Sequence, residues 1–169
     1  EWFSEKDEPL IIRNYSGTRQ KPHPFGLTLQ SDGVCGEEKV TERLITALNV
    51  SGIDCSQSEA KKILEEWGMS HRGEDRVSQL SAGLRRRLAV ISGMAPAMMC
   101  EAPRLVFLDE PSEGLDSFSK GVLKKWISEL SQYGNAIVMA SHDEEIIACS
   151  SRILTIESGE ISETKNNIE

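Results

Sequence analysis

The chain has 169 residues, a length that suits one domain with a sizeable core. It carries 19 basic and 27 acidic residues, a net charge of −8, and this balance argues against a nucleic-acid partner, which needs a basic face. The four cysteines, Cys35, Cys55, Cys100 and Cys149, are neither clustered nor spaced as CxxC. A zinc site or disulfide framework is therefore not expected, and the pattern favours reduced thiols in a cytoplasmic protein.

No segment of the sequence is long and apolar enough to predict a transmembrane helix. The longest weakly polar stretch, Leu88 to Cys100, falls short of about 18 apolar residues. The first residues are acidic, whereas a secretory signal begins with a basic region. Because the sequence does not begin with methionine, we expect a fragment or a processed product.

The first part of the chain, residues 1–39, is expected to form two short strands. Leu10 to Arg13 and Phe25 to Leu29 are apolar runs of strand length. The segment between them contains Pro22 and Pro24, and each proline keeps the preceding residue extended, so this segment is not helical. The second strand runs to Gln30, and a turn follows it.

Residues 40–98 have the pattern of helices. Thr41 is expected to cap a first helix that ends near Gly52, and Ser58 to cap a second that Gly68 closes. A third helix is expected from Leu84 to about Met98.

Strands and helices alternate in residues 99–169, which predicts a parallel sheet with right-handed crossovers. The expected elements are a strand at Leu105 to Asp109, a helix from near Phe118 to Gln132 closed by Gly134, a strand from Ala136 toward His142, a short helix from Glu144 to Ala148, a hairpin of Arg152 to Glu157 and Glu160 to Ser162, and a frayed polar tail from Glu163 to Glu169.

The segment from Leu105 to Asp116 is the most informative part of the sequence. Four apolar residues lead directly to Asp109 and Glu110, which predicts a strand of a parallel sheet that is buried on both faces. Ligands bind beyond the carboxyl ends of such strands. One carboxylate can then face a metal and the other a water, a division of roles that phosphoryl transfer needs.

The order and spacing of several segments resemble the ATPase subunit of ATP-binding cassette (ABC) proteins, from about residue 10 to residue 162. Leu80 to Gly83 resembles the family's signature, and Leu105 to Asp109 its Walker B strand. Glu113 to Asp116 is similar to the D-loop, His142 to the switch histidine and Gln30 to the Q-loop glutamine.

The resemblance implies an α/β fold with an ABC-type P-loop NTPase core, incomplete at the N-terminus and carrying an inserted helical subdomain. In this division, residues 1–39 hold the N-terminal strands and the Q-loop region. Residues 40–98 form the helical subdomain with the signature. Residues 99–169 form the RecA-like core, with Walker B, D-loop, switch histidine and C-terminal hairpin.

The resemblance also implies ATP and Mg²⁺ as cofactors and gives roles to individual residues. Asp109 and Gln30 would bind or sense the metal, and Gln30 would also contact the nucleotide and sense the membrane partner. Glu110 would orient or deprotonate the attacking water, and His142 would hydrogen-bond the γ-phosphate.

Ser81, Ala82 and Gly83 open a helix, whose free N–H groups suit phosphate, and in ABC dimers this signature reaches the nucleotide held by the other subunit. Asp116 of the D-loop is expected to contact nucleotide as well. Ala82 replaces the family's usual glycine, and Leu84 its usual glutamine. Arg85 to Arg87 form either a solvated helix face or a group that docks the helix on its neighbours.

The sequence contains no GxxxxGK[ST], the loop that cradles the phosphates. By the resemblance, this loop would lie upstream of Glu1, or it is deleted between Leu10 to Asn14 and Phe25. In either case the chain alone is expected to bind ATP poorly and to hydrolyse it negligibly.

Three functions remain open at this point. The first is the C-terminal portion of the ATP-hydrolysing subunit of an ABC transporter, in a homo- or heterodimeric nucleotide sandwich, cytoplasmic and bound to a membrane through transmembrane subunits. The second is a degenerate binding or regulatory subunit that lends its signature to a partner's ATP site. The third is a soluble non-transport ABC ATPase. The presence of Asp109, Glu110 and His142 together favours the first.

Overall fold

The computed structural model describes residues 26–30, 34 and 36–165, so the strand predicted at Leu10 to Arg13 lies outside the described residues. The elements are β1 (Gly26–Thr28), α1 (Val40–Val50), α2 (Gln57–Glu66), two short 3₁₀ helices (Ser70–Arg72 and Val77–Gln79), α3 (Ala82–Met98), β2 (Leu105–Asp109), α4 (Ser117–Gln132), β3 (Ala136–Ala140), α5 (Glu144–Ile147), β4 (Arg152–Glu157) and β5 (Glu160–Lys165).

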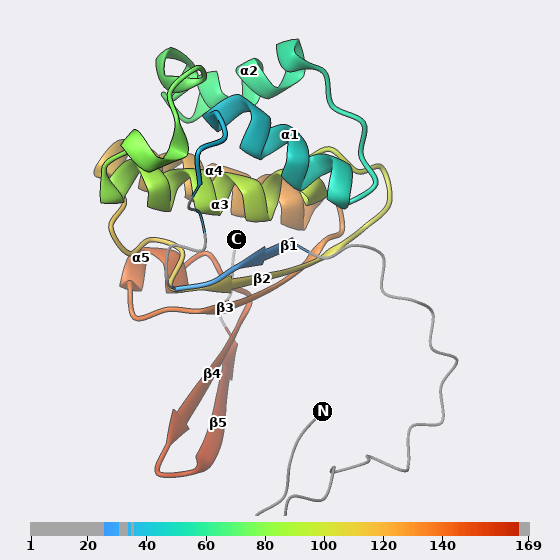
Figure 1. The fold of residues 1–169 in the computed structure, drawn as a ribbon. Coiled ribbons are helices and arrows are strands. Elements are labelled where there is room, and N and C mark those ends of the chain that lie inside the picture. Colours follow the sequence, from blue (N-terminus) through green and yellow to red (C-terminus); the bar gives the residue numbers. More distant parts are fainter. Residues whose placement is uncertain (1–25, 31–33, 35, 166–169) are drawn as a thin grey trace, which may run out of the picture.

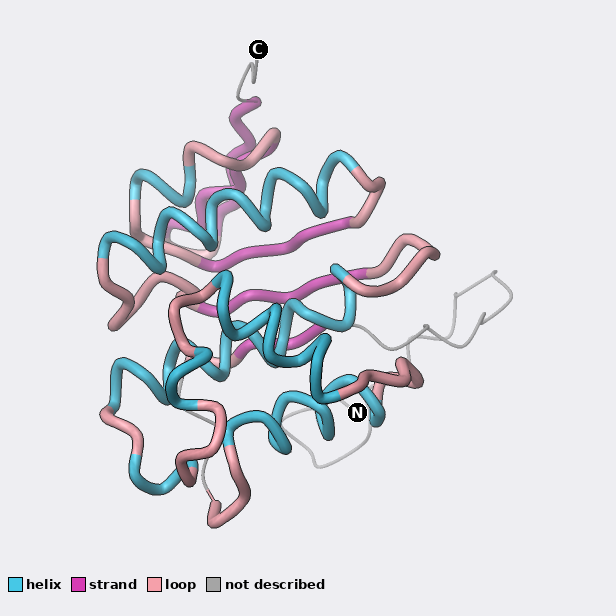
Figure 2. The backbone as a smooth tube through the Cα atoms, turned by 90° about the horizontal axis from the view of Figure 1, so that it is seen from above, coloured by secondary structure: helices cyan, strands magenta, loops and turns pink. Residues whose placement is uncertain are grey.

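Within the described ranges, three parallel strands form the central sheet in the order β1–β2–β3, and β4 and β5 form a separate antiparallel hairpin (Figures 1 and 2). The predicted parallel α/β sheet is confirmed. The prediction that the chain frays from Glu163 onward is wrong for residues Glu163 to Lys165, which belong to β5. Glu163 accepts a hydrogen bond from Arg152 Nε at 2.8 Å, and the ladder of β4 and β5 continues to Lys165.

Helices α1 to α4 all lie on one side of the central sheet (Figure 1). Val106 and Leu108 of β2 are buried, but the alternate positions on the three strands are open. Leu27, Phe107 and Val138 lie side by side in the register and are 47%, 38% and 53% exposed. The expectation that this sheet is buried on both faces is therefore wrong for the described residues. We call these three side chains the apolar row.

Helix α3 packs on β1 at a point where both elements have a glycine. A Cβ atom added to Gly26 would overlap the backbone carbonyl oxygen of Gly93. A Cβ atom added to Gly93 would in turn overlap Oγ1 of Thr28. The absence of both side chains lets the two backbones approach closely, and this contact sets the distance between α3 and the sheet.

Two predicted helix caps are wrong. Thr41 does not cap α1, which begins at Val40; its buried side chain instead donates a hydrogen bond to the carbonyl oxygen of Gly73 at 2.9 Å. The cap of α2 is Ser56 rather than Ser58. Ser56 Oγ accepts from the N–H of Glu59, whose carboxylate accepts from the N–H of Ser56 at 2.8 Å, a capping box.

The helical part and the sheet share one apolar core. Helix α3 contacts both α1 and the sheet strands β1 and β2, so it belongs to the helical part and to the core alike. The rings of Trp67, at the end of α2, and Trp126, on α4, meet edge to face with centroids 5.2 Å apart. The proposed division at residue 98 therefore falls at the end of a helix that serves both parts.

None of the helices in the described ranges has the length and apolar character that crossing a bilayer requires. Cys55, Cys100 and Cys149 are free thiols, as predicted, and Cys35 lies outside the described residues.

Candidate functional site

The carboxyl end of β2 presents Asp109 and then Glu110. Glu110 has a φ of 45°, in the left-handed region, which costs a residue other than glycine about 1 kcal/mol or more. Its N–H donates to the carbonyl oxygen of Ala140 on β3 at 2.9 Å, and its side chain is only 17% exposed. The fold therefore holds Glu110 in one strained conformation at the end of the sheet.

His142 lies directly against Glu110. Its Nδ1 is 3.0 Å from Glu110 Oε1, and its backbone N–H donates to Oε2 at 3.4 Å. The hydrogen bond to Glu110, followed by the charge of that carboxylate, raises the pKa of His142. The imidazole is 81% exposed, so the structure joins the two residues predicted as catalytic and leaves the histidine facing outward.

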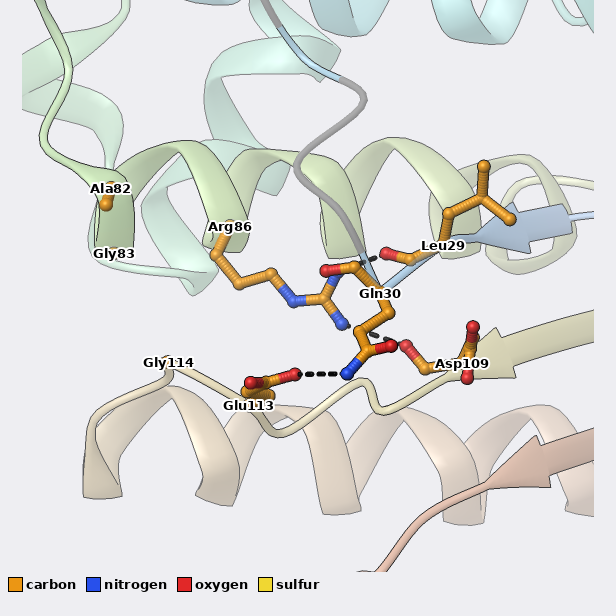
Figure 3. Close-up of a pocket in the computed structure, with 8 residues that line it drawn as sticks. All are labelled: Leu29, Gln30, Ala82, Gly83, Arg86, Asp109, Glu113 and Gly114. Atoms are coloured by element: carbon orange, nitrogen blue, oxygen red, sulfur yellow. Dashed lines mark hydrogen bonds between the residues drawn. The ribbon is translucent and has the colours of Figure 1, made fainter.

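An open cavity of about 500 Å³ lies beyond the ends of β1 and β2 (Figure 3). The signature helix, the Q-loop end of β1 and the D-loop all contribute to it. Its lining residues are Leu29, Gln30, Ala82, Gly83, Arg86, Asp109, Glu113 and Gly114. Within it, Gln30 Nε2 donates to Glu113 Oε2 at 3.3 Å. The cavity thus brings the two predicted metal residues, Gln30 and Asp109, together with part of the signature.

The residues of this cavity fit a magnesium ion that is shared with a phosphate ligand. Asp109 and Gln30 offer a carboxylate and an amide oxygen, and Mg²⁺ prefers hard oxygen ligands. Among the described residues, no group of three or more His, Cys, Asp or Glu side chains could enclose a metal.

The signature leads from the buried Leu80 into the exposed first turn of α3. Ser81 caps the helix, since its Oγ accepts from the N–H of Leu84 at 3.3 Å, and Ala82 and Gly83 follow on the surface. A Cβ atom on Gly83 would lie 3.5 Å from the carbonyl oxygen of Gly114, so the signature and the D-loop are neighbours within one chain. The free N–H groups of this turn are available to an anion.

Asp116 has structural partners in the described chain. Its Oδ1 accepts from the N–H of Ser119 at 2.8 Å, which caps α4, and its Oδ2 pairs with Arg87 Nη2 at 2.8 Å. The bond to Ser119 is the main cause of its lowered pKa. Its contact with nucleotide stays a prediction.

The arginines after the signature do not form a solvated face. Arg86 is 4% exposed, and Arg87 donates to the carbonyl oxygen of Trp67 at 3.0 Å. The docking alternative is therefore right for these two residues. Three consecutive residues of a helix point in directions about 100° apart, so at least one of them had to turn inward; this is the signal that could have identified Arg86.

An ion pair fixes the segment after His142. Lys120 Nζ on α4 is 2.7 Å from Asp143 Oδ2, and this bond is the main cause that lowers the pKa of Asp143 to about 2. We expect Asp143→Asn to lower the free energy of unfolding by about 1 kcal/mol at neutral pH. An unfolded aspartate protonates near pH 4, so the pair stabilises above about pH 4 and its contribution is lost as the pH falls toward 2.

Chemical unfolding of Asp143→Asn and wild type across this pH range measures the effect. The two curves should converge between about pH 4 and pH 2. Glu144→Gln, at the exposed neighbouring position, is the control and should track wild type throughout. A difference that is independent of pH would contradict the assignment.

Known proteins resemble the chain in sequence and in fold. It is 30% identical over 156 residues to the macrolide export ATP-binding/permease protein MacB of Aggregatibacter actinomycetemcomitans, which covers 91% of this chain and 23% of that protein. It is 32% identical over 138 residues to the lipoprotein-releasing system ATP-binding protein LolD of Shewanella frigidimarina, with 80% and 56% covered. A scan against protein-family models finds no match.

Among solved structures, the dimeric post-hydrolysis ATP-binding cassette MJ0796 bound to ADP and Pi superimposes with a TM-score of 0.71 at 19% identity, over 83% of this chain and 62% of that one. The ATP-binding subunit of an ABC transporter gives the same TM-score and coverage of this chain. The chain thus spans less than a quarter of MacB and just over half of LolD. It has the α/β fold of ABC-type P-loop NTPases, and it belongs to the ATP-binding cassette family as part of such a cassette domain.

Proposed function

We propose that the chain is the C-terminal portion of the ATP-hydrolysing subunit of an ABC transporter and works in a nucleotide-sandwich dimer. The observation that carries this proposal is the pair of Glu110 and His142. If Glu110 had no functional role, nothing would require its backbone to adopt the left-handed conformation. Nor would anything require its carboxylate to lie shielded from water against His142. Backbone strain of this kind is concentrated at functional sites.

The geometry of the pair suits hydrolysis of a γ-phosphate. The carboxylate of Glu110 can orient an attacking water and accept its proton, because its own position is fixed by the backbone. His142, whose pKa is raised, can present an N–H to a phosphate oxygen from its exposed ring. Mg²⁺, held by Asp109 with Gln30, would neutralise charge on the phosphates when it is bound.

The apolar row supports the view that more of a cassette belongs on this sheet. Parallel sheets are normally covered on both faces, whereas helices α1 to α4 cover only one. The sequence also lacks a phosphate-binding GxxxxGK[ST]. We infer that the part of the cassette that carries this loop packs on the apolar row, so that its phosphate cradle meets the carboxyl ends of β1 and β2.

The partners follow from the exposed signature and from the relatives. The first turn of α3 presents free N–H groups at the surface, where the nucleotide of a second cassette can reach them. The MJ0796 cassette is dimeric, and MacB is an ATP-binding/permease protein. These relatives support a second ABC subunit and transmembrane transporter subunits as partners. The proposal places the chain at the cytoplasmic side of the membrane that holds those subunits.

The test is ATP hydrolysis by two preparations. The 169-residue chain alone is expected to give no turnover above background. The same residues joined to a P-loop-bearing segment, either that encoded next to them or that of a related cassette, are expected to hydrolyse ATP. Turnover by the chain alone that Glu110→Gln abolishes would contradict the need for a separate cradle. A joined protein that binds ATP but does not hydrolyse it would favour the degenerate subunit.

A further inference from the structure

We propose that Arg86 is a positioning residue that holds Glu110 in its strained conformation and fixes the Gln30 end of β1 beside it. The inference rests on the proposed function in one respect, namely that Glu110 is the residue that serves the reaction. Arg86 belongs to α3, one turn after the signature, so it connects the signature helix to the two strand ends where the chemistry is proposed.

The guanidinium of Arg86 lies between the ends of β1 and β2 (Figure 3). Its Nη2 donates to the carbonyl oxygens of Asp109 at 3.0 Å and Glu110 at 2.5 Å. Its Nη1 donates to the carbonyl oxygens of Leu29 and Gln30, the latter at 3.2 Å. Each nitrogen thus contacts two successive carbonyls of one strand end, and the side chain is 4% exposed.

This arrangement needs an arginine. A planar guanidinium directs its N–H groups outward in a fixed fork, so its two terminal nitrogens can serve two separate chain segments at once. A lysine places its donors on a single nitrogen and cannot span both strand ends in the same way. The stem of Arg86 also passes Gly114 of the D-loop, where an added Cβ atom would lie 3.8 Å from Arg86 Cγ. One side chain therefore bonds to the Q-loop and Walker B strand ends and lies beside the D-loop.

Glu110 depends on this contact because its backbone is strained. Its N–H donates to Ala140, and its carboxylate contacts the ring and the backbone N–H of His142. Its carbonyl oxygen accepts from Arg86 and also from the N–H of Glu113 at 3.1 Å, and Arg86 is the charged one of these two donors. Without the guanidinium, the carbonyl oxygen of Asp109 loses this donor, and that of Glu110 loses its charged donor while it keeps the N–H of Glu113. Glu110 can then leave the left-handed region, and this rotation carries its carboxylate away from His142.

The pKa of His142 reports this displacement without any nucleotide. Glu110 is the largest cause of its raised value, while Glu113 and Asp143 contribute less. Arg86→Met and Arg86→Lys leave these three carboxylates in the sequence and remove the forked donor, and Arg86→Lys also keeps the positive charge. If Arg86 has a general structural role, both variants lower stability and leave the pKa of His142 unchanged. If Arg86 positions Glu110, the pKa falls.

The experiment is NMR titration of the His142 ring in the 169-residue chain, with Glu110→Gln as the reference for loss of the Glu110 charge. Both Arg86 variants are expected to lower the pKa of His142 by more than half of the shift that Glu110→Gln causes. Arg85→Met is the matched control, because Arg85 donates to the carbonyl oxygen of Leu80, just before α3. It should leave the titration unchanged.

Folded Arg86 variants with the wild-type titration of His142 would overturn the proposal. Arg86→Lys keeps a buried cation and is the deciding variant if Arg86→Met does not fold. Because the titration needs no ATP, it is read independently of hydrolysis. A lowered pKa together with an inactive joined protein would reject the proposed function and retain the positioning role.

Discussion

Replacing Glu110 by glutamine is expected to lower the turnover number for ATP by about 100- to 1,000-fold in the joined, P-loop-bearing protein. Glutamine keeps the size and the hydrogen-bonding capacity of the side chain but cannot accept a proton from water. Because Glu110 is not among the residues that line the cavity with Gln30 and Asp109, nucleotide affinity should change little. The loss should therefore appear in kcat, with KM nearly constant.

Steady-state hydrolysis over a range of ATP concentrations separates the two constants. Glu101→Gln is a suitable control, since this exposed residue precedes β2 and lies at the opposite end of the strand from the site. It should hydrolyse ATP as the unsubstituted protein does. A Glu110→Gln protein with nearly unchanged kcat would show that Glu110 does not take part in hydrolysis, and this result would contradict the proposed mechanism.

A single methyl group at Gly26 is expected to destabilise the chain by about 3 kcal/mol. The added Cβ atom would overlap the backbone carbonyl of Gly93, which cannot rotate away as a flexible side chain could. Relief requires β1 and α3 to separate, and this movement would also open the core beneath Val106. Urea unfolding should show a lower midpoint for Gly26→Ala.

Gly121→Ala gives the opposite expectation and serves as the matched control. Gly121 lies within α4 and is exposed, and an added Cβ atom there has no atom within 4 Å. Because alanine favours a helix interior over glycine, this variant should be more stable by about 0.5 to 1 kcal/mol. A Gly26→Ala protein as stable as wild type would show that the two backbones are not held in close contact.

The order of elements could be predicted from the sequence because glycines and apolar runs mark it clearly. Leu105 to Asp109 and Ala136 to Ala140 are strands as predicted, and α4 ends before Gly134, which has a φ of 79°. The residues that cap the helices were harder to predict from the sequence. Ser56 and Ser58 both precede the apolar positions of α2, and only the reciprocal bonds with Glu59 distinguish them.

Only part of the candidate site could be predicted from the sequence, and the reason is physical. Asp109 ends β2, and Glu110 and His142 come just after β2 and β3, so the topology of a parallel sheet brings their backbones together. Arg86 was missed because helical periodicity shows that a side chain turns inward but does not show what it meets. Its partners are backbone carbonyls of two distant segments. Every residue has a backbone carbonyl, so the sequence does not show which of them will accept a hydrogen bond.

The edge-to-face contact of Trp67 and Trp126 gives the chain an intrinsic fluorescence signal that depends on how its two parts are placed. One ring ends a helix of the helical part and the other sits on α4 against the sheet, 5.2 Å away. Indole fluorescence depends on the immediate surroundings of the ring, and both rings are almost fully buried. A rotation of α1 and α2 relative to the sheet would separate the rings and change the emission, so movement between the two parts can be followed without attaching a dye.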